Sequence, residues 1–340
     1  MKNLTLAAIA VVCVAIIGYF AIQERHSSTV SDRGLYFPQL VDQINNVTEI
    51  QFTTSQTRYS IRKMSGKWSL DVADNYPVRF DLVRDFLVGM SQLRILEAKT
   101  DDPDRHHLLD LAGVDSEGSR TILIELSDSQ LRPLAQLYVG TSRTSVRNPA
   151  LNEYYVRDVG RSQTWLTEGN LDVTTFPFEW LDLELSDLDN DQVREVVIMR
   201  DHGKPVRVYR TSAESSNFHL DGVPQGYKVR HQYVVNDIGK IFRRLDFVDV
   251  RSAKGWIDGG VSATAVLFNG IRLHVQVGSG EFAQYHAFSA QADESISEEG
   301  MNQVDEMNTK YRGWVYKLSD QRSGIINSQF DDLIESVGAK

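Results

Sequence analysis

One pattern of apolar residues occurs twice in this 340-residue chain, and it restricts the possible folds more than any other feature. The first copy, at residues 47–71, reads VTEIQFTTSQTRYSIRKMSGKWSLD; the second, at residues 193–221, reads VREVVIMRDHGKPVRVYRTSAESSNFHLD. In each copy, apolar and polar residues alternate over three short runs separated by turn residues. Alternation with a period of two is typical of antiparallel strands with one buried face. Each copy is therefore predicted to form a three-stranded meander.

A helix is predicted directly after each meander. In residues 78–98 the apolar residues recur at spacings of three and four, which is the period of a helix with one apolar face. That face consists of Leu82, Val83, Phe86, Met90 and Leu93. The stretch after the second meander repeats it with Val234, Val235, Ile238, Phe242 and Leu245. Aligning the last leucine of each set also aligns Met90 with Phe242, so the order of the elements is repeated as well as their type.

Further stretches correspond in the same order along the two halves of the chain. The matched stretches are residues 134–140 with 272–278, 164–166 with 314–318, and the closing amphipathic segments 176–185 with 325–337. Several matches in one order indicate a tandem duplication rather than chance similarity between two ordinary stretches.

The predicted fold class is α+β, with an N-terminal transmembrane helix followed by two tandem repeats of an antiparallel meander plus helix. In each repeat the helix is expected to cover the sheet, because neither element can bury its apolar face alone. The predicted parts are an anchor at residues 1–26, a spacer at 27–37, a first repeat at 38–186, and a second repeat at 190–338 with an insertion at 290–312. The insertion has Val304, Met307 and Tyr311 at helical spacing. It is expected either to dock a partner or to cover its own sheet.

The transmembrane prediction depends on residues 4–22, LTLAAIAVVCVAIIGYFAI, which contain no charged side chain. A helix of this length measures about 29 Å, close to the thickness of a bilayer core. A cleavable signal peptide is the alternative, but its apolar core is usually only about 7–15 residues long. The sequence thus favours an uncleaved single-pass anchor, with the lipid bilayer as a partner through residues 4–22.

The orientation follows from the few charges that flank this run. Lys2 precedes it, and the positive-inside rule then places the short N-terminus in the cytoplasm. The predicted localisation is a bacterial inner membrane, single-pass, with the C-terminal body in the periplasm.

Charge and cysteine content argue against two classes of function. The net charge is -10, whereas nucleic-acid-binding proteins usually present a basic face to the phosphates, so no nucleic-acid partner is expected. The single cysteine, Cys13, allows neither an intramolecular disulfide nor a zinc site built from several thiolates.

The densest group of possible metal ligands lies in DDPDRHHLLDL at residues 101–111. Its candidate ligands are Asp101, Asp102, Asp104, His106, His107 and Asp110. His106 and Asp110 would share one face of a helix, but Pro103 interrupts the run and no second segment with zinc ligands is evident. We interpret the stretch as a surface loop in which Asp104 caps a short helix, with a metal site as the alternative.

The remaining motifs are weak. DLDND at residues 187–191 has the aspartate spacing of a calcium loop, but Gln192 and Ile198 stand where glycine and glutamate are needed. The glycines follow neither dinucleotide-binding nor P-loop spacing, and there is no G-x-S-x-G elbow. The five tryptophans could stack on sugars; they are Trp68, Trp165, Trp180, Trp256 and Trp314. We therefore assign no catalytic, cofactor-binding or metal-binding residue, and no cofactor.

Residues 66–102 combine a Gly66-Lys67-Trp68 strand, a polar loop and a helix that runs through Leu93. In this order the elements resemble the domain-of-unknown-function 4340 family, over most of residues 40–185 and more weakly over 190–335. Phe218 replaces the tryptophan of this pattern in the second copy. The resemblance implies no established reaction. Members of the family often resemble neighbours of gliding-type ABC transporter auxiliary proteins, which implies an accessory role in a transport complex.

The sequence as a whole therefore predicts a membrane-anchored extracytoplasmic binding or scaffold protein, accessory to an ABC-type transport complex and not an enzyme. Its expected partners are envelope or transporter proteins. One alternative is an extracytoplasmic metal-dependent hydrolase that uses residues 101–110. The other is a glycan-binding or small-ligand-binding protein that uses exposed aromatic residues.

Overall fold

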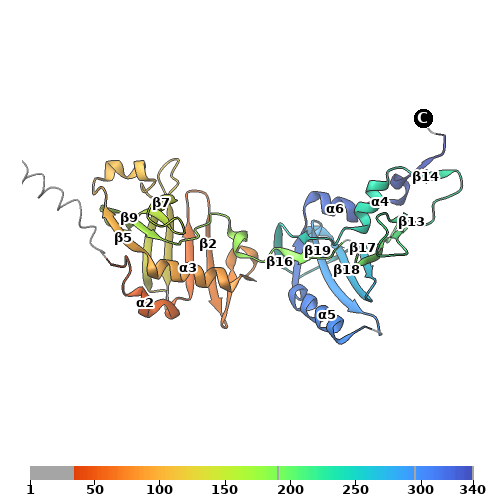
Figure 1. Ribbon diagram of the computed structural model, residues 1–340, viewed down its shortest axis with the longest axis horizontal. Coiled ribbons are helices and arrows are strands. Elements are labelled where there is room, and N and C mark those ends of the chain that lie inside the picture. The colour runs from red at the N-terminus through yellow and green to blue at the C-terminus, as the bar shows by residue number, and fades with distance from the viewer. Residues whose placement is uncertain (1–33, 190, 295, 339–340) are drawn as a thin grey trace, which may run out of the picture. The chain divides into compact units, whose positions relative to one another are not determined.

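The computed structural model describes residues 34–189, 191–294 and 296–338, which group into two compact units (Figure 1). Within the described residues, unit 1 comprises residues 34–69 and Val78–Trp180. Unit 2 comprises Leu70–Pro77 and the described residues from Leu181 onward. The short segment Leu70–Pro77 thus belongs to unit 2, although it lies between two elements of unit 1 in the sequence.

The first half of the chain forms a nine-stranded sheet in the order β4-β3-β2-β1-β6-β7-β8-β9-β5. Its strands are β1 (Glu49–Thr53), β2 (Arg58–Met64), β3 (Lys67–Leu70), β4 (Tyr76–Pro77), β5 (Arg94–Ala98), β6 (Ile122–Ser127), β7 (Pro133–Thr144), β8 (Asn152–Asp158) and β9 (Thr164–Gly169). The helices are α2 (Leu40–Gln43) and α3 (Phe80–Gln92), with 3-10 turns η1 (Ile44–Asn46), η2 (Asp71–Ala73), η3 (Pro103–Leu109) and η4 (Pro177–Trp180). From β2 across to β5 the strand pairings are antiparallel.

Unit 2 is built around an eight-stranded sheet in the order β13-β12-β11-β17-β18-β19-β20-β16. These strands are β11 (Val193–Arg200), β12 (Val206–Tyr209), β13 (His219–Leu220), β16 (Asp249–Ser252), β17 (Asp258–Leu267), β18 (Ile271–Gly278), β19 (Tyr285–Ala292) and β20 (Trp314–Lys317). Two small sheets pair β10 (Glu184–Ser186) with β15 (Leu245–Asp246), and β14 (Tyr227–Val229) with β21 (Ile334–Ser336). The helices are α4 (Gln232–Gly239), α5 (Glu298–Tyr311) and α6 (Asp320–Ile326), with 3-10 turns η5 (Gly280–Phe282) and η6 (Phe330–Leu333).

Apart from the additional edge strand β4 of the first sheet, the two large sheets have the same strand order. β3-β2-β1-β6-β7-β8-β9-β5 in the first sheet corresponds, strand for strand, to β13-β12-β11-β17-β18-β19-β20-β16 in the second. In both, a three-stranded meander is followed by a helix, then by an edge strand at the far side of the sheet, and then by four strands that fill the space between. This shared connectivity is what a tandem duplication produces.

The alternating sequence pattern explains how the first sheet buries one face. Ile50 and Phe52 of β1 lie opposite Ile61 and Tyr59 of β2, and all four are almost completely buried. Cross-strand partners project on the same side of a sheet, so these pairs build one continuous apolar surface. Helix α3 lies across the strands of this sheet in Figure 1 and contributes its own buried residues, among them Met90.

The prediction of an α+β fold is wrong, because both units are mostly antiparallel sheet with few helices. The apolar period after the second meander supports a helix only as far as Gly239, and the chain then continues in turns to Leu245. The closing segments also form little helix. Residues 176–185 contain only the 3-10 turn η4, and residues 325–337 contain the end of α6, η6 and β21.

The predicted membrane anchor and inner-membrane localisation are also corrected. In the part of the chain that the structure describes, no helix is long and apolar enough to cross a membrane. The longest of these helices, α5, has 14 residues and carries charged residues along its exposed side. Residues 4–22 lie outside the described residues, and the predictions of a single-pass anchor and a periplasmic body depended on that run and on the charges that flank it. They are not retained.

The insertion at 290–312 contains α5, which covers unit 2's own sheet. Val304 and Tyr311 are buried, and the Tyr311 ring lies 5.6 Å from that of Phe288 on β19. The Asn308 side chain donates to the Ala290 carbonyl and accepts from the Ala290 amide, both at 2.9 Å, so it pairs with β19 as a neighbouring strand would. Of the two roles expected for this insertion, the structure shows the covering role for its apolar residues.

Candidate functional site

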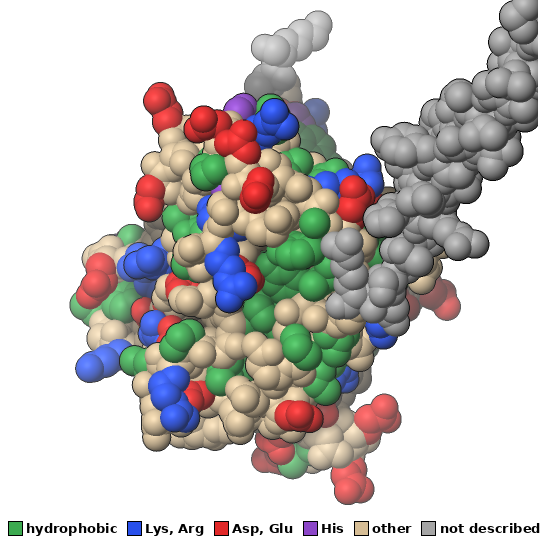
Figure 2. Space-filling view, turned by 90° about the vertical axis from the view of Figure 1, so that its left-hand side faces the viewer, with side chains coloured by type: hydrophobic (Ala, Val, Ile, Leu, Met, Phe, Trp, Pro, Cys, Tyr) green, Lys and Arg blue, Asp and Glu red, His purple; other side chains and the backbone are tan. Residues whose placement is uncertain are grey.

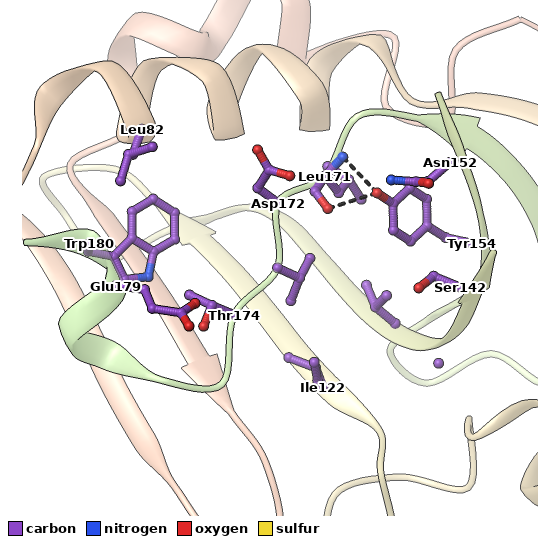
Figure 3. Close-up of a pocket in the computed structure, with 13 residues that line it drawn as sticks. Leu82, Ile122, Ser142, Asn152, Tyr154, Leu171, Asp172, Thr174, Glu179 and Trp180 are labelled. Atoms are coloured by element: carbon purple, nitrogen blue, oxygen red, sulfur yellow. Dashed lines mark hydrogen bonds between the residues drawn. The ribbon is translucent and has the colours of Figure 1, made fainter. Parts of the chain in front are cut away.

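A cavity of 460 Å³ in unit 1 lies between the buried face of the sheet, α3, and a covering segment at residues 171–180. Its lining residues are Leu82, Ile122, Val139, Gly140, Ser142, Asn152, Tyr154, Leu171, Asp172, Val173, Thr174, Glu179 and Trp180. Figure 3 shows Leu82 and Trp180 at one end and Tyr154, Asn152 and Ser142 at the other, with the covering segment running between them. This volume falls in the range of sites that bind small molecules.

A bulge in β7 brings two unlike side chains to the cavity floor. Ile122 lies opposite Val139, whereas Ser142 lies opposite Tyr154, and the register shifts between Val139 and Ser142. In a regular strand, residues three apart point to opposite faces, so the extra residue of the bulge is what lets Val139 and Ser142 line one cavity. The floor is therefore apolar at its centre and polar at one end.

Two tyrosine hydroxyl groups hold the covering segment to the sheet. The Tyr154 hydroxyl donates to the Leu171 carbonyl at 2.8 Å and accepts from the Leu171 amide at 3.0 Å. The Tyr59 hydroxyl donates to the Thr174 carbonyl at 2.8 Å and accepts from the Trp180 indole N–H at 3.1 Å. Each hydroxyl thus donates one hydrogen bond and accepts another. Its partners are backbone or indole groups of the covering segment, which would lack these hydrogen bonds without the tyrosine. The segment is fixed on both sides of Val173.

Aromatic packing makes the Trp180 end of the cavity rigid. The Trp180 ring lies 5.6 Å from the Phe52 ring and 5.7 Å from the Phe86 ring, and Phe52 stacks on Tyr59 at 5.0 Å. These separations are typical of favourable ring pairs in protein cores. Burial raises the pKa of Tyr59 well above its ordinary value, so its hydroxyl stays protonated and available as a donor.

Two glycines permit close approach of backbone segments around the cavity. A Cβ atom at Gly89 of α3 would lie 2.0 Å from the Asn170 carbonyl oxygen, directly before the covering segment. A Cβ atom at Gly140 of β7 would lie 2.0 Å from the Leu109 carbonyl oxygen. A side chain at either position would push backbone aside, so both glycines help to set the shape of the cavity.

Four polar side chains of the cavity have no hydrogen-bond or ion-pair partner among the described residues; they are Ser142, Asn152, Asp172 and Glu179. Two other carboxylates of unit 1 are paired with arginines. Glu153 lies 2.7 Å from Arg143, and Asp128 lies 2.6 Å from Arg132. The hydrogen bond from Arg132 lowers the pKa of Asp128. The unpaired groups of the cavity can therefore accept or donate hydrogen bonds to a ligand without breaking existing contacts.

Three of the Asp and His residues at 101–110 serve separate structural roles. Asp102 accepts from the Asp104 amide at 3.1 Å and caps the 3-10 turn η3, a role that the sequence assigned to Asp104. The ring of the buried His106 bonds the Ser162 carbonyl at 2.7 Å, and Asp110 accepts from the Thr141 hydroxyl at 2.6 Å. Within the described residues, no group of three or more His, Cys, Asp or Glu is arranged to hold a metal ion.

Residues 187–189 and 191, in the aspartate-rich stretch before β11, form neither helix nor strand. The Asp189 amide donates to the side chain of Gln192 at 2.8 Å, and the Asp187 carboxylate lies 3.8 Å from Arg244. Of the carboxylates that could imitate a calcium loop, that of Asp187 therefore lies near a local partner, and residue 190 lies outside the described residues.

The tryptophans do not form an exposed row. Trp68 and Trp180 are buried, and the other three are partly buried in their own units. Trp180 alone lines the cavity, and its indole N–H is engaged by Tyr59.

Reasoning from the sequence missed the residues of the cavity. Asp172 and Glu179 lie in NLDVTTFPFEW, residues 170–180, which has neither strand nor helix periodicity. The amphipathic closing segment predicted at residues 176–185 includes Glu179 but not Asp172. An irregular stretch that holds several apolar residues and one proline is a signal for a loop that packs on a core. It does not reveal the strand residues, such as Ser142, that the fold brings beneath it.

Comparison with known protein families identifies the family to which the chain belongs. Residues 68–258, more than half of the sequence, match the family described as domain of unknown function DUF4340. The chain belongs to this family, as the resemblance of residues 66–102 implied. Among curated proteins, none matches the sequence significantly.

Proposed function

We propose that the protein is a non-catalytic binding protein that serves as an accessory subunit of an ABC-type transport complex. The observation that carries the binding part of the proposal is the cavity of unit 1, which combines an apolar floor with unpaired polar side chains. Such a combination is characteristic of sites that hold a ligand by its apolar body and orient it by a few polar groups.

The roles of the chemically capable residues support binding rather than catalysis. Asp102, His106 and Asp110 each complete a turn or hold a loop, so their bonds are already used within unit 1. Catalytic acids and bases are usually found where neighbours shift their pKa values and where a cavity gives access to substrate. A small-ligand-binding function agrees with the cavity, whereas nothing in the described residues favours the metal-dependent hydrolase.

The transport part of the proposal comes from the family. Members of the family often resemble neighbours of gliding-type ABC transporter auxiliary proteins, and proteins that act together must present surfaces to one another. Two units with the same sheet order give the chain a repeated framework suited to holding partners.

Affinity capture of the tagged full-length chain after chemical cross-linking tests this proposal. We expect ATP-binding-cassette subunits to be enriched over an untagged control. A Val173→Trp variant should reduce the yield, because an indole in the covering segment fills the cavity. Val159→Trp, at an exposed position outside the cavity, should not. Equal recovery with both variants would exclude the cavity from the interaction, and recovery without any transport subunit would contradict the accessory role.

A further inference from the structure

We infer that the cavity of unit 1 binds an organic ammonium group joined to an apolar body. This inference rests on the proposed binding function and deepens it by assigning the chemical class of the ligand. Two features of the cavity carry it: the sign of its charged residues and the position of its apolar surface.

The charged side chains that line the cavity are all acidic. Asp172 and Glu179 are the charged residues among the thirteen, and neither has an ion-pair partner in the described part of the chain. Three other cavities bordered by described residues each include an arginine: Arg94, Arg161 or Arg251. The face of unit 1 in Figure 2 likewise mixes acidic and basic side chains. The charge of this cavity therefore selects a cation rather than an anion.

The apolar surface of the cavity selects a ligand with a substantial apolar part. Ile122 and Val139 are cross-strand partners in the floor, and Val173 of the covering segment also lines the cavity. Leu82 and Trp180 lie at one end of it in Figure 3. An exposed carboxylate attracts a solvated ammonium only weakly, because water screens both charges. Burial of the apolar body must supply most of the affinity, and the two carboxylates at the exposed rim then decide which headgroup is accepted.

Polar groups at the far end can complete the recognition. Ser142 and Asn152 lie near Tyr154 in Figure 3, at the end opposite Trp180, and their side chains are unpaired within the described residues. The Tyr154 hydroxyl is engaged by Leu171, so it is not free to turn toward a ligand. Ser142 and Asn152 thus offer hydrogen bonds to a second polar group of the ligand.

Unit 2 differs from unit 1 at the corresponding place in the chain. In unit 1 the last long strand, β9, is followed by the irregular stretch that borders the cavity. In unit 2 the corresponding strand, β20, is followed by α6, which packs against β17 and buries Ile326. The repeat therefore carries a helix where unit 1 has an irregular covering segment, and the inference is confined to unit 1.

A ligand series with one apolar body and three headgroups tests the inference on the full-length chain. The probes are 4-phenylbutylammonium, 4-phenylbutanol and 4-phenylbutyrate, titrated at pH 7 and followed by ligand-observed NMR. We expect the ammonium to bind about tenfold more tightly than the carboxylate, with the alcohol between them. Equal affinities for all three would overturn the assigned ligand class and leave the binding function standing. If no probe binds and Val173→Trp also leaves partner capture unchanged, both the inference and the proposed function fail.

Two pairs of charge-removing substitutions, one inside the cavity and one outside it, test whether the cavity carboxylates cause the preference for the ammonium. Asp172→Asn with Glu179→Gln should remove the preference for the ammonium without changing the affinity for the alcohol. Asp115→Asn with Glu117→Gln is the control, because these two carboxylates are exposed in unit 1 and lie outside the cavity. If the control pair lowers the preference as much as the cavity pair, overall charge is responsible and the inference is wrong.

The ammonium group that the cavity binds could belong to a free amine or to a lysine side chain in a polypeptide. N-acetyl-Phe-Lys-amide, compared with its norleucine analogue, separates the two sources. If the lysine peptide binds more tightly than both its norleucine analogue and 4-phenylbutylammonium, the natural ligand is a lysine side chain of a polypeptide. Weaker binding assigns it to a small amine.

Discussion

At the scale of single residues, two tyrosine hydroxyls do more than fill space in unit 1. Tyr59 and Tyr154 lie on the buried face of the sheet, and each hydroxyl both donates a hydrogen bond to the covering segment and accepts one from it. Between these two attachments the segment spans the cavity. The shape of the site therefore depends on hydroxyl groups that a ligand need not touch.

Tyr59→Phe should destabilise unit 1 by about 1–3 kcal/mol, because the Thr174 carbonyl and the Trp180 indole both lose their partner in a buried place. Tyr138→Phe is the control, since no hydrogen bond of the Tyr138 hydroxyl is seen within the described residues, and it should change stability by less than about 0.5 kcal/mol. Denaturant unfolding of both variants measures the difference. A Tyr59→Phe protein as stable as the control would show that the covering segment is held by packing alone.

His286 predicts a pH dependence in unit 2. Its Nδ1 donates to the Tyr316 carbonyl at 3.2 Å, its Nε2 has no partner within the described residues, and burial lowers its pKa to about 4. Below about pH 6.5 the unfolded chain gains a proton at this residue that the folded chain does not, so stability falls between pH 6.5 and 4. At 1.36 kcal/mol per pKa unit, the loss is about 3 kcal/mol.

His286→Asn removes the titration and keeps an amide that can donate to Tyr316. Unfolding free energies of the variant and the wild type should converge as the pH is lowered from 7.5 to 4. A variant whose stability declines as steeply as that of the wild type would assign the acid sensitivity to other groups.

At the scale of elements, the two repeats differ most in the connections between their shared strands. After β19 the chain makes α5, which covers the sheet, whereas β8 passes to β9 through a short turn. After β20 it makes α6, whereas β9 is followed by the covering segment of the cavity. The strands that both repeats share build the framework of each unit, and the connections that differ between the repeats give each unit its own surface.

The contact between α5 and β19 is specific enough to test. Asn308→Ala removes the side chain that bonds both backbone groups of Ala290, and we expect a loss of about 1–3 kcal/mol. Asn302→Ala, on the exposed side of the same helix, should cost little. Hydrogen exchange of the Ala290 amide gives a direct measurement, and unchanged protection in Asn308→Ala would contradict the strand-like role of this side chain.

The sequence predicts the regular elements of this fold better than it predicts the site. Alternation in residues 47–71 corresponds to β1, β2 and β3, and helical spacing after Pro77 corresponds to α3, because these patterns reflect one buried face. The same reasoning overextended the second helix beyond Gly239, where tertiary contacts favour turns. The cavity could not be derived, because Ser142, Tyr154 and Asp172 meet only through strand register, a bulge and an irregular segment.

At the scale of the whole molecule, the chain contains two compact units, each with its own core. Met90 is completely buried in unit 1 and Phe242 is almost completely buried in unit 2. Met90→Ala and Phe242→Ala should each cost about 2–5 kcal/mol, as large-to-small changes in cores do. The exposed neighbours Val88 and Tyr233 provide control substitutions to alanine.

Hydrogen exchange resolved by peptide can separate these effects. Each core substitution should lower protection mainly in its own unit, because each unit buries its own apolar face. If Met90→Ala lowers protection as strongly in the strands of unit 2 as in those of unit 1, the two cores do not act separately.

The central claim is that this protein acts by binding and that the site lies in unit 1. Hydrogen exchange of the full-length chain, measured with and without 4-phenylbutylammonium, tests it most directly. We predict added protection in residues 139–142, 152–154 and 171–180, which border the cavity. The corresponding part of unit 2, around β20 and α6, should be unchanged. Protection that appears in unit 2 instead, or in neither unit at saturating ligand, would contradict the claim.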